Sequence, residues 1–244
     1  MIERSEFMEL TIIIPSYTEG ENLKIHLPYI VEICRRICKT FEIVIVDTMT
    51  PTDATLDICR LLPNIVYLAR EKSNAYGDAI RTGIHYSKGK YIIIMDADGS
   101  HEPDFIPKLW SQRENADIVI ASRYVKGGKT ENALPLQMMS RILNFTYRLF
   151  LNIPCADISN SFKLYRGDQL RSLKLVCQHF DIIEEILIKF FVYYPSIRAI
   201  EIPCIFRQRN QGETKRNLMT FVFSYLKTIR QLRKFKKRGE SLCK

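Results

Sequence analysis

The chain has 244 residues, of which 46% are hydrophobic and 26% are charged, and it carries a net charge of +9. This length and composition suit one α/β domain with at most a short appendage, and they exclude a chain that is disordered throughout. The positive charge favours an anionic partner, which would be a phosphorylated substrate, a membrane surface or a nucleic acid.

Short, β-branched apolar runs alternate with longer helical patterns over the first 125 residues. Strands are expected at 10–14, 42–46, 65–68, 91–95 and 117–121, and helices at about 21–38, 53–62, 75–88 and 103–113. Strands that are apolar throughout are typical of a parallel sheet with both faces buried. The alternation therefore predicts an α/β fold with a Rossmann-like, mostly parallel central sheet flanked by helices.

The pattern changes after residue 130, where we expect helices near 136–151, 168–175 and 181–193 and a strand at 197–203. A basic C-terminal segment then repeats apolar residues at helical spacing, namely Leu218, Val222, Tyr225, Ile229 and Leu232. We therefore divide the chain into a catalytic domain, 1–215, and a basic amphipathic helix and tail, 216–244. This helix either lies among the headgroups of anionic lipids, with 216–238 as a peripheral membrane contact, or packs on the domain.

Neither a signal peptide nor a transmembrane helix is expected from this sequence. Acidic residues precede the first apolar run, which makes the N-terminus a poor signal peptide. No stretch is long and apolar enough to predict a transmembrane helix. The seven cysteines form no CxxC pair, as expected for reduced thiols. We therefore expect a cytoplasmic protein whose contact with a membrane is peripheral.

Two carboxylates, Asp96 and Asp98, follow the apolar strand expected at 91–95. Ligands of doubly wound sheets bind beyond the carboxyl ends of the strands. Mg²⁺ and Mn²⁺ prefer oxygen ligands and often share them with substrate phosphates. A lone Asp-x-Asp is more often a solvated turn, but its position after a buried strand indicates a metal site formed by this pair.

Other polar residues are expected at the same edge of the sheet. Glu19 and Asp47 end two strands and suit a ribose or a base, although such residues also cap helices. The chain has neither a GxGxxG motif nor a phosphate loop, so a nucleotide would be held through a metal. Arg123, Arg209 and Lys215 are candidate phosphate ligands. His101 lies close to the Asp pair in the sequence and could contact the site.

Six motifs in order resemble the family-2 glycosyltransferases of the GT-A fold, most closely the dolichyl-phosphate (polyprenyl-phosphate) mannose synthase branch. The matching segments are 14–22, 45–47, 96–103, 121–128, 157–165 and 209–215. The resemblance implies an inverting enzyme that moves a hexose from a GDP- or UDP-sugar to a polyprenyl phosphate on the cytosolic membrane face. It also implies that Mg²⁺ or Mn²⁺ is the cofactor.

The resemblance also implies a role for individual residues. The residues implied to bind the nucleotide sugar are Pro15, Tyr17, Glu19, Asp47, Asp96, Arg209 and Lys215. Asp96 and Asp98 would bind the metal, and Asp98 and Arg123 would act in the transfer itself. The acceptor phosphate would be held by Arg123, Arg141 and Ser161, because Gln137 stands where an arginine is often found in the family.

Two alternative functions remain open from the sequence. A family-2 enzyme that glycosylates a saccharide hydroxyl would need a general base, for which Asp157 and Glu185 are the candidates. A lipid monophosphate needs no base because it is already largely ionised at neutral pH. A nucleic-acid-binding protein is disfavoured, since the positive charge is concentrated in the tail and no nucleic-acid motif is present.

Overall fold

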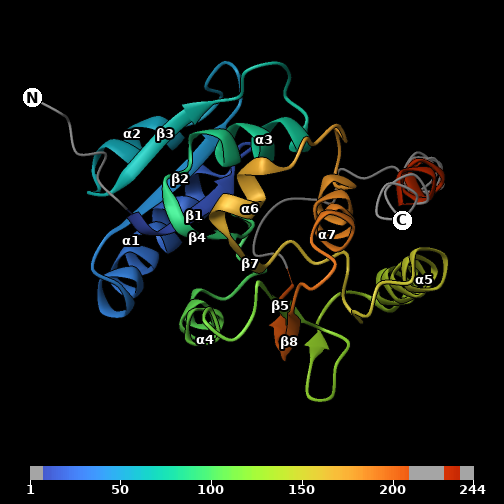
Figure 1. The fold of residues 1–244 in the computed structure, drawn as a ribbon. Coiled ribbons are helices and arrows are strands. Elements are labelled where there is room, and N and C mark those ends of the chain that lie inside the picture. The colour runs from blue at the N-terminus through green and yellow to red at the C-terminus, as the bar shows by residue number, and fades with distance from the viewer. Residues whose placement is uncertain (1–7, 209–227, 237–244) are drawn as a thin grey trace, which may run out of the picture.

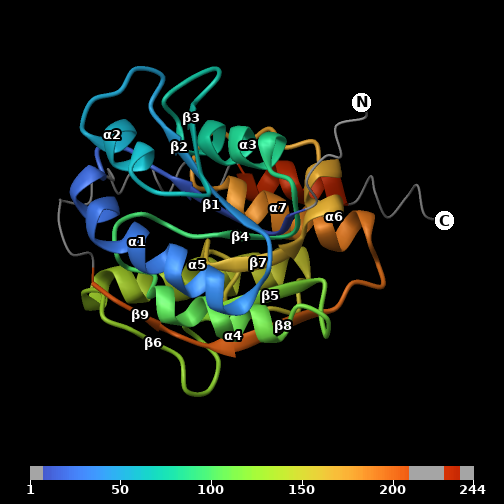
Figure 2. The ribbon, with the colours of Figure 1, turned by 90° about the vertical axis from the view of Figure 1, so that its left-hand side faces the viewer.

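The computed structural model describes residues 8–208 and 228–236. A seven-stranded sheet with the order β3-β2-β1-β4-β7-β5-β8 lies between two layers of helices (Figures 1 and 2). Its strands are β1 (Met8–Pro15), β2 (Phe41–Asp47), β3 (Ile65–Ala69), β4 (Gly89–Ile94), β5 (Ile118–Ser122), β7 (Lys163–Arg166) and β8 (Ala199–Pro203). The strands pair in parallel except at β7. This sheet confirms the mostly parallel α/β fold that the sequence predicts.

Helices cover both faces of the sheet because each central strand is apolar on both sides. In β1, Ile12 and Ile14 pack on one face and Ile13 on the other. The first face is covered by α1 (Gly20–Ile37), α2 (Thr55–Arg60), the short η1 (Pro103–Phe105) and α4 (Ile106–Ser111). The second is covered by α3 (Tyr76–Tyr86), α6 (Gly167–Ser172) and α7 (Ile182–Tyr193).

Three strands were not predicted from the sequence. Strand β7 lies between β4 and β5 and runs antiparallel to both. The other two, β6 (Lys129–Thr130) and β9 (Ile205–Phe206), form a separate two-stranded sheet. Each depends on partners far away in the sequence, so a local pattern carries little signal for it.

Helix α5 (Leu134–Leu151) has little contact with the domain. It buries only Asn144, Tyr147 and Leu151 among its 18 residues. Its exposed apolar side chains include Leu134, Met138, Ile142, Phe145 and Leu149. We call these five residues the α5 stripe; their spacing of four, four, three and four residues places them along one side of the helix.

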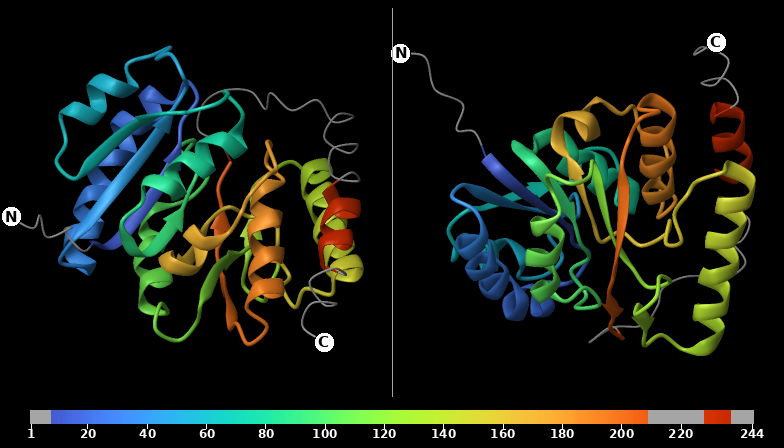
Figure 3. Two further views of the ribbon diagram at one scale, coloured as in Figure 1. Left: turned by 45° about the horizontal axis from the view of Figure 1, so that its top comes forward. Right: turned by 60° about the horizontal axis from the view of Figure 1, so that its bottom comes forward.

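The helical segment 228–236 lies beside α5 (Figure 3). Ile229 and Leu232 are buried and belong to the core under α7. Of the two alternatives that the sequence left open, these two residues therefore favour packing on the domain over a membrane-facing surface, because both side chains are buried. The rest of the predicted apolar face, Leu218, Val222 and Tyr225, lies outside the described residues. Within the described ranges no helix is long and apolar enough to cross a membrane.

Candidate active site

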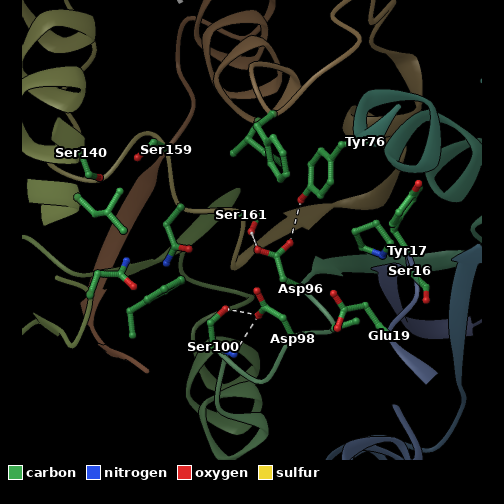
Figure 4. A pocket seen from close by; sticks show the side chains of 18 of the residues that line it. Ser16, Tyr17, Glu19, Tyr76, Asp96, Asp98, Ser100, Ser140, Ser159 and Ser161 are labelled. Carbon is green, nitrogen blue, oxygen red and sulfur yellow. Dashed lines mark hydrogen bonds between the residues drawn. The ribbon is translucent and has the colours of Figure 1, made fainter. Parts of the chain in front are cut away.

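A cavity of about 450 Å³ opens at the carboxyl ends of the strands, where the sequence places its polar residues. One wall comes from the ends of β1 and β3 and the start of α3, and the floor from the turn after β4 (Figure 4). The opposite wall comes from the end of β5, from α5 and from the loop 157–162, which we call the acceptor-side loop. The arrangement is the one expected for a ligand site in a doubly wound sheet.

Asp96 and Asp98 both line this cavity. Asp96 accepts a hydrogen bond from the Tyr76 hydroxyl at 2.9 Å on Oδ1 and one from the Ser161 hydroxyl at 3.0 Å on Oδ2. Asp98 Oδ1 accepts hydrogen bonds from the Ser100 backbone N–H at 3.0 Å and its hydroxyl at 2.6 Å. The two carboxylates are thus oriented toward one space, as Figure 4 shows.

The turn that carries the pair suits a hard divalent cation. No cluster of three or more His, Cys, Asp or Glu able to hold a metal occurs within residues 8–208 and 228–236. Two carboxylates that leave further positions to phosphate oxygens and water are the usual protein contribution to an Mg²⁺ site. The donor set of this turn therefore fits the metal that the sequence predicts.

The wall beside β1 contains three of the predicted nucleotide-binding residues. Pro15, Tyr17 and Glu19 line the cavity. Glu19 Oε2 accepts a hydrogen bond of 2.7 Å from the Asn22 side chain, which fixes the carboxylate at the start of α1. An exposed tyrosine ring next to a fixed carboxylate offers a flat apolar surface and a hydrogen-bond acceptor side by side.

Arg70 belongs to the same wall, and the sequence analysis missed it. Its guanidinium lies 5.7 Å from the centre of the Tyr17 ring and donates a hydrogen bond of 2.6 Å to the Ser16 carbonyl. Arg70 is buried, and its Nε has no hydrogen-bond partner in the described part of the chain. A usable signal existed, because Arg70 directly follows β3 as Asp47 directly ends β2.

Asp47 is not brought into the cavity. Its side chain is fully buried and accepts hydrogen bonds from the Tyr67 hydroxyl at 3.0 Å and the Thr48 N–H at 2.7 Å. It ends β2, which lies between β1 and β3 in the sheet, and it is not among the residues that line the cavity. Its predicted contact with the nucleoside stays a prediction.

Arg123 lines the opposite wall, but its guanidinium is paired within the protein. Nε and Nη2 donate to the two carboxylate oxygens of Asp157 at 2.8 and 2.7 Å, and Nη2 also reaches the Ser159 hydroxyl at 3.0 Å. Burial alone would raise the pKa of Asp157, but the charge and hydrogen bonds of Arg123 hold it below its ordinary value. The guanidinium that the resemblance implies for the acceptor phosphate thus makes its two-pronged contact with Asp157.

The two candidate general bases do not line the cavity. Asp157 is the buried partner of Arg123. Glu185 forms a buried ion pair of 2.7 Å with Lys189 and accepts hydrogen bonds from the Val176 and Cys177 N–H groups. Both carboxylates are therefore structural in this arrangement, and the prediction that one of them faces an acceptor is not supported.

The remaining predicted residues are divided between the site and its surroundings. Ser161 lines the cavity and contacts Asp96, as described above. Arg141 is exposed on α5, where its guanidinium lies 5.1 Å from the centre of the Tyr124 ring, and it does not line the cavity. Arg209 and Lys215 lie outside the described residues.

Known proteins are similar to this chain over most of its length. The family model of glycosyl transferase family 2 matches residues 11–173. The chain is 32% identical to a dolichol-phosphate mannosyltransferase of Pyrococcus furiosus, an alignment that covers 93% of this chain and 64% of the relative. It is 31% identical to an undecaprenyl-phosphate mannosyltransferase of Micrococcus luteus, with 85% and 87% covered. The chain thus spans less than two thirds of the Pyrococcus relative and most of the Micrococcus one.

Solved structures share the fold. Glucosyl-3-phosphoglycerate synthase from Mycobacterium tuberculosis, in complex with Mn²⁺, uridine diphosphate and phosphoglyceric acid, has a TM-score of 0.67. The two chains are 15% identical, and the superposition covers 91% of this chain and 76% of that one. At this identity the likeness shows the fold alone. Because the family model matches most of the chain and the sheet has the GT-A arrangement, the chain belongs to glycosyl transferase family 2.

Proposed function

We propose that this protein transfers a hexosyl group, with inversion, from a nucleotide sugar to the phosphate of a polyprenyl phosphate. The observation that carries the proposal is a cavity that joins the Asp96 and Asp98 carboxylates to a wall on which the described residues place no carboxylic acid or histidine. The relatives named above are a dolichol-phosphate and an undecaprenyl-phosphate mannosyltransferase, which supports a polyprenyl phosphate as the acceptor class.

The donor would lie against the β1 wall. Tyr17 and Arg70 offer a ring and a cation to a base or diphosphate, and Glu19 offers an acceptor to a hydroxyl group. Departure of a nucleoside diphosphate leaves negative charge on the leaving group. A divalent cation held by Asp96 and Asp98 would supply the Lewis acid that stabilises this charge. The chain's own part is to hold both carboxylates in place, through Tyr76, Ser161 and Ser100.

The acceptor would approach from the opposite wall. Its polar lining, within the described residues, consists of Arg123 and of hydroxyl and amide side chains, namely Asn132, Ser140, Ser159, Asn160 and Ser161. Arg123, Ser159 and the amide side chains can donate hydrogen bonds to a phosphate, whereas the Ser161 hydroxyl already donates to Asp96. None of these side chains is suited to take a proton from a sugar hydroxyl. A lipid phosphate needs no such base, because its second pKa is about 6. The composition of this wall therefore favours the lipid phosphate over a saccharide acceptor.

Asp98→Ala tests the metal part of the proposal. Transfer from GDP- and UDP-hexoses to a short-chain polyprenyl phosphate should require Mg²⁺ or Mn²⁺, and the variant should lose at least about 100-fold in rate. Asp104→Ala, which alters an exposed carboxylate outside the cavity, is the matched control. Full activity of Asp98→Ala, or of the wild type in excess chelator, would contradict the metal site. Transfer to a saccharide but not to lipid phosphate would contradict only the acceptor.

We further propose that the membrane contact is made by the α5 stripe rather than by the apolar face of the C-terminal helix. The five side chains of the stripe are between 63% and 73% exposed. The helix contains Arg141 and Arg148 and no acidic residue. On the other side of the same helix, Leu136, Met139 and Leu143 line the cavity.

Cations of the neighbouring segment 228–236 extend this surface. Arg230, Arg233 and Lys234 are exposed. The Arg233 guanidinium lies 5.5 Å from the centre of the Phe150 ring, and Lys236 Nζ donates to the Leu151 carbonyl at 2.6 Å, so the two helices are in contact. An apolar helix face bordered by cations suits the headgroup region of an anionic bilayer, here the cytosolic face. A lipid phosphate in the cavity would then keep its chain next to the bilayer.

Replacement of the stripe tests this contact. Ile142→Ser combined with Phe145→Ser should weaken cosedimentation with phosphatidylglycerol vesicles by about tenfold. The reason is that two large apolar side chains would no longer be buried in the bilayer on binding. Leu61→Ser, which alters an exposed leucine on the C-terminal end of α2, is the control. If the double variant partitions onto vesicles as the wild type does, the stripe is not the membrane contact.

A further inference from the structure

His101 is buried next to the candidate metal site, but it does not line the cavity. Its Nδ1 accepts a hydrogen bond of 2.9 Å from the Asp96 backbone N–H. Its Nε2 lies 3.0 Å from Oδ1 of the Asn160 side chain. The ring stacks on Phe162, with 4.7 Å between the ring centres, and meets Phe206 edge-on at 5.4 Å. All four contacts hold one orientation of the imidazole.

The hydrogen-bond pattern also defines where the ring proton lies. A backbone N–H can only donate, so Nδ1 must be the unprotonated nitrogen and Nε2 must carry the hydrogen. Asn160 presents its oxygen to that hydrogen because its amide nitrogen donates to the Ala121 carbonyl at 2.7 Å. The chain Asp96 N–H, His101 and Asn160 therefore runs in one direction and ends on strand β5.

We propose that His101 is a positioning residue for the metal site, and that it couples the Asp96–Asp98 turn to the acceptor-side loop. This inference rests on the proposed metal-dependent function. The backbone N–H of Met95 still bonds to β1, at the Ile13 carbonyl, whereas that of Asp96 is the first to leave the sheet. An N–H that points at a buried side chain would be costly without an acceptor, and the imidazole of His101, which is buried, supplies that acceptor.

The consequence for the site follows from the way Asp96 is held. Its backbone is fixed by His101, and its carboxylate is fixed by Ser161 from the acceptor-side loop and by Tyr76 from α3. Asn160, which anchors His101, precedes Ser161 in that same loop. Both the backbone and the side chain of Asp96 therefore depend on one loop. Groups that orient a metal ligand typically change metal affinity 10- to 100-fold when they are removed.

Two substitutions separate positioning from simple packing. In His101→Asn, the side-chain oxygen can occupy about the place of Nδ1 and still accept from Asp96, but the contact with Asn160 is lost. In His101→Gln, the amide nitrogen can reach Asn160 in place of Nε2, but the acceptor for Asp96 is lost. Both variants lose the ring stack on Phe162, so they form a matched pair for packing.

The measurement is Mn²⁺ affinity in the presence of GDP or UDP, by calorimetry, together with the melting temperature of each variant. We expect His101→Gln to bind Mn²⁺ 10- to 100-fold more weakly and His101→Asn to retain most of the affinity, whichever variant melts lower. Equal losses in the two variants, or losses that follow the melting temperature, would overturn the inference. If Asp98→Ala binds Mn²⁺ as the wild type does, the metal site itself is wrong and the inference fails with it.

A measurement on the wild type needs no variant to fold. Nitrogen-15 NMR of protein labelled at histidine distinguishes a protonated ring nitrogen from an unprotonated one. We expect His101 to carry its hydrogen on Nε2 and to leave Nδ1 bare. A hydrogen on Nδ1 would exclude the bond from Asp96 and would overturn the inference.

Discussion

Helices α1 and α5 both have 18 residues and an apolar side, but the domain covers only one of these sides. Helix α1 buries eight residues, most of them apolar, against the sheet. Helix α5 buries three, and one of them is an asparagine. Asn144 attaches α5 to the acceptor-side loop, because its Oδ1 accepts hydrogen bonds from the Ile158 and Ser159 N–H groups at 2.7 and 3.0 Å.

The comparison shows that the two helices are stabilised by different forces. Helix α1 is anchored by apolar burial, which is insensitive to direction. Helix α5 buries only Tyr147 and Leu151 as apolar side chains and is also anchored by directional hydrogen bonds to the loop that lines the cavity, while its apolar stripe remains uncovered. A large exposed apolar surface is rare unless it binds something. The helix that carries this exposed stripe is therefore also one that polar groups attach to the domain.

The largest expected change in stability comes from breaking the buried ion pair between Arg123 and Asp157, which lies on the same side of the cavity as α5. Asp157→Asn would leave the Arg123 guanidinium buried without its counterion, so we expect a loss of about 3–5 kcal/mol in the free energy of unfolding. The control is Glu32→Gln on α1, whose ion pair with Arg36 is exposed on both sides and should change stability by less than about 1 kcal/mol. Urea denaturation at neutral pH measures both free energies of unfolding. Equal losses in the two variants would contradict the prediction that the buried ion pair contributes more than the exposed one.

The same pair predicts a pH dependence. Arg123 lowers the pKa of Asp157 in the folded state below its ordinary value, although burial acts in the opposite direction. A carboxyl with a depressed folded pKa stabilises the protein above its unfolded pKa and loses that effect as the pH falls. The stability gap between wild type and Asp157→Asn should therefore be full at neutral pH and shrink below about pH 4. A gap that grows in acid would contradict this assignment of charge.

The second prediction compares how much the apolar sides of α1 and α5 contribute to the free energy of unfolding. Leu27 on α1 is fully buried, and Leu27→Ala should cost about 2–5 kcal/mol of unfolding free energy. Phe145 on α5 is 65% exposed, and Phe145→Ala should change stability by less than about 0.5 kcal/mol in solution. A large cost for Phe145→Ala in the absence of lipid would mean that the α5 stripe is covered after all.

The smallest of the three effects concerns the polar anchor of α5. Asn144→Leu leaves the Ile158 and Ser159 N–H groups without their acceptor, which should cost about 1–3 kcal/mol. Asn144→Asp keeps an oxygen for both donors and is the conservative control. Hydrogen exchange should show the loss of protection at 158 and 159 in the leucine variant only. If both variants lose protection alike, α5 is not held through these two bonds.

Local sequence patterns determined most of the fold and the centre of the site. The alternation of apolar strands and amphipathic helices predicts the parallel part of the sheet, because each of these strands has apolar side chains on both of its faces. The position of Asp96 and Asp98 beyond β4 follows from the same pattern. The family resemblance, rather than local pattern, placed Ser161, Pro15 and Tyr17 at the site. Glu19, after the end of β1, was expected there from both, and these four residues line one cavity with the Asp pair.

Only the tertiary structure decided which partner each of the other groups has. Strand β7 lies between β4 and β5, Arg123 is bound by Asp157, and Ile229 and Leu232 are buried while the α5 stripe is exposed. Each of these facts depends on residues far apart in the chain. A charge or an apolar face can be recognised from local spacing. Its contribution to stability or binding depends on which groups cover it, and the packing of the whole domain decides which groups those are.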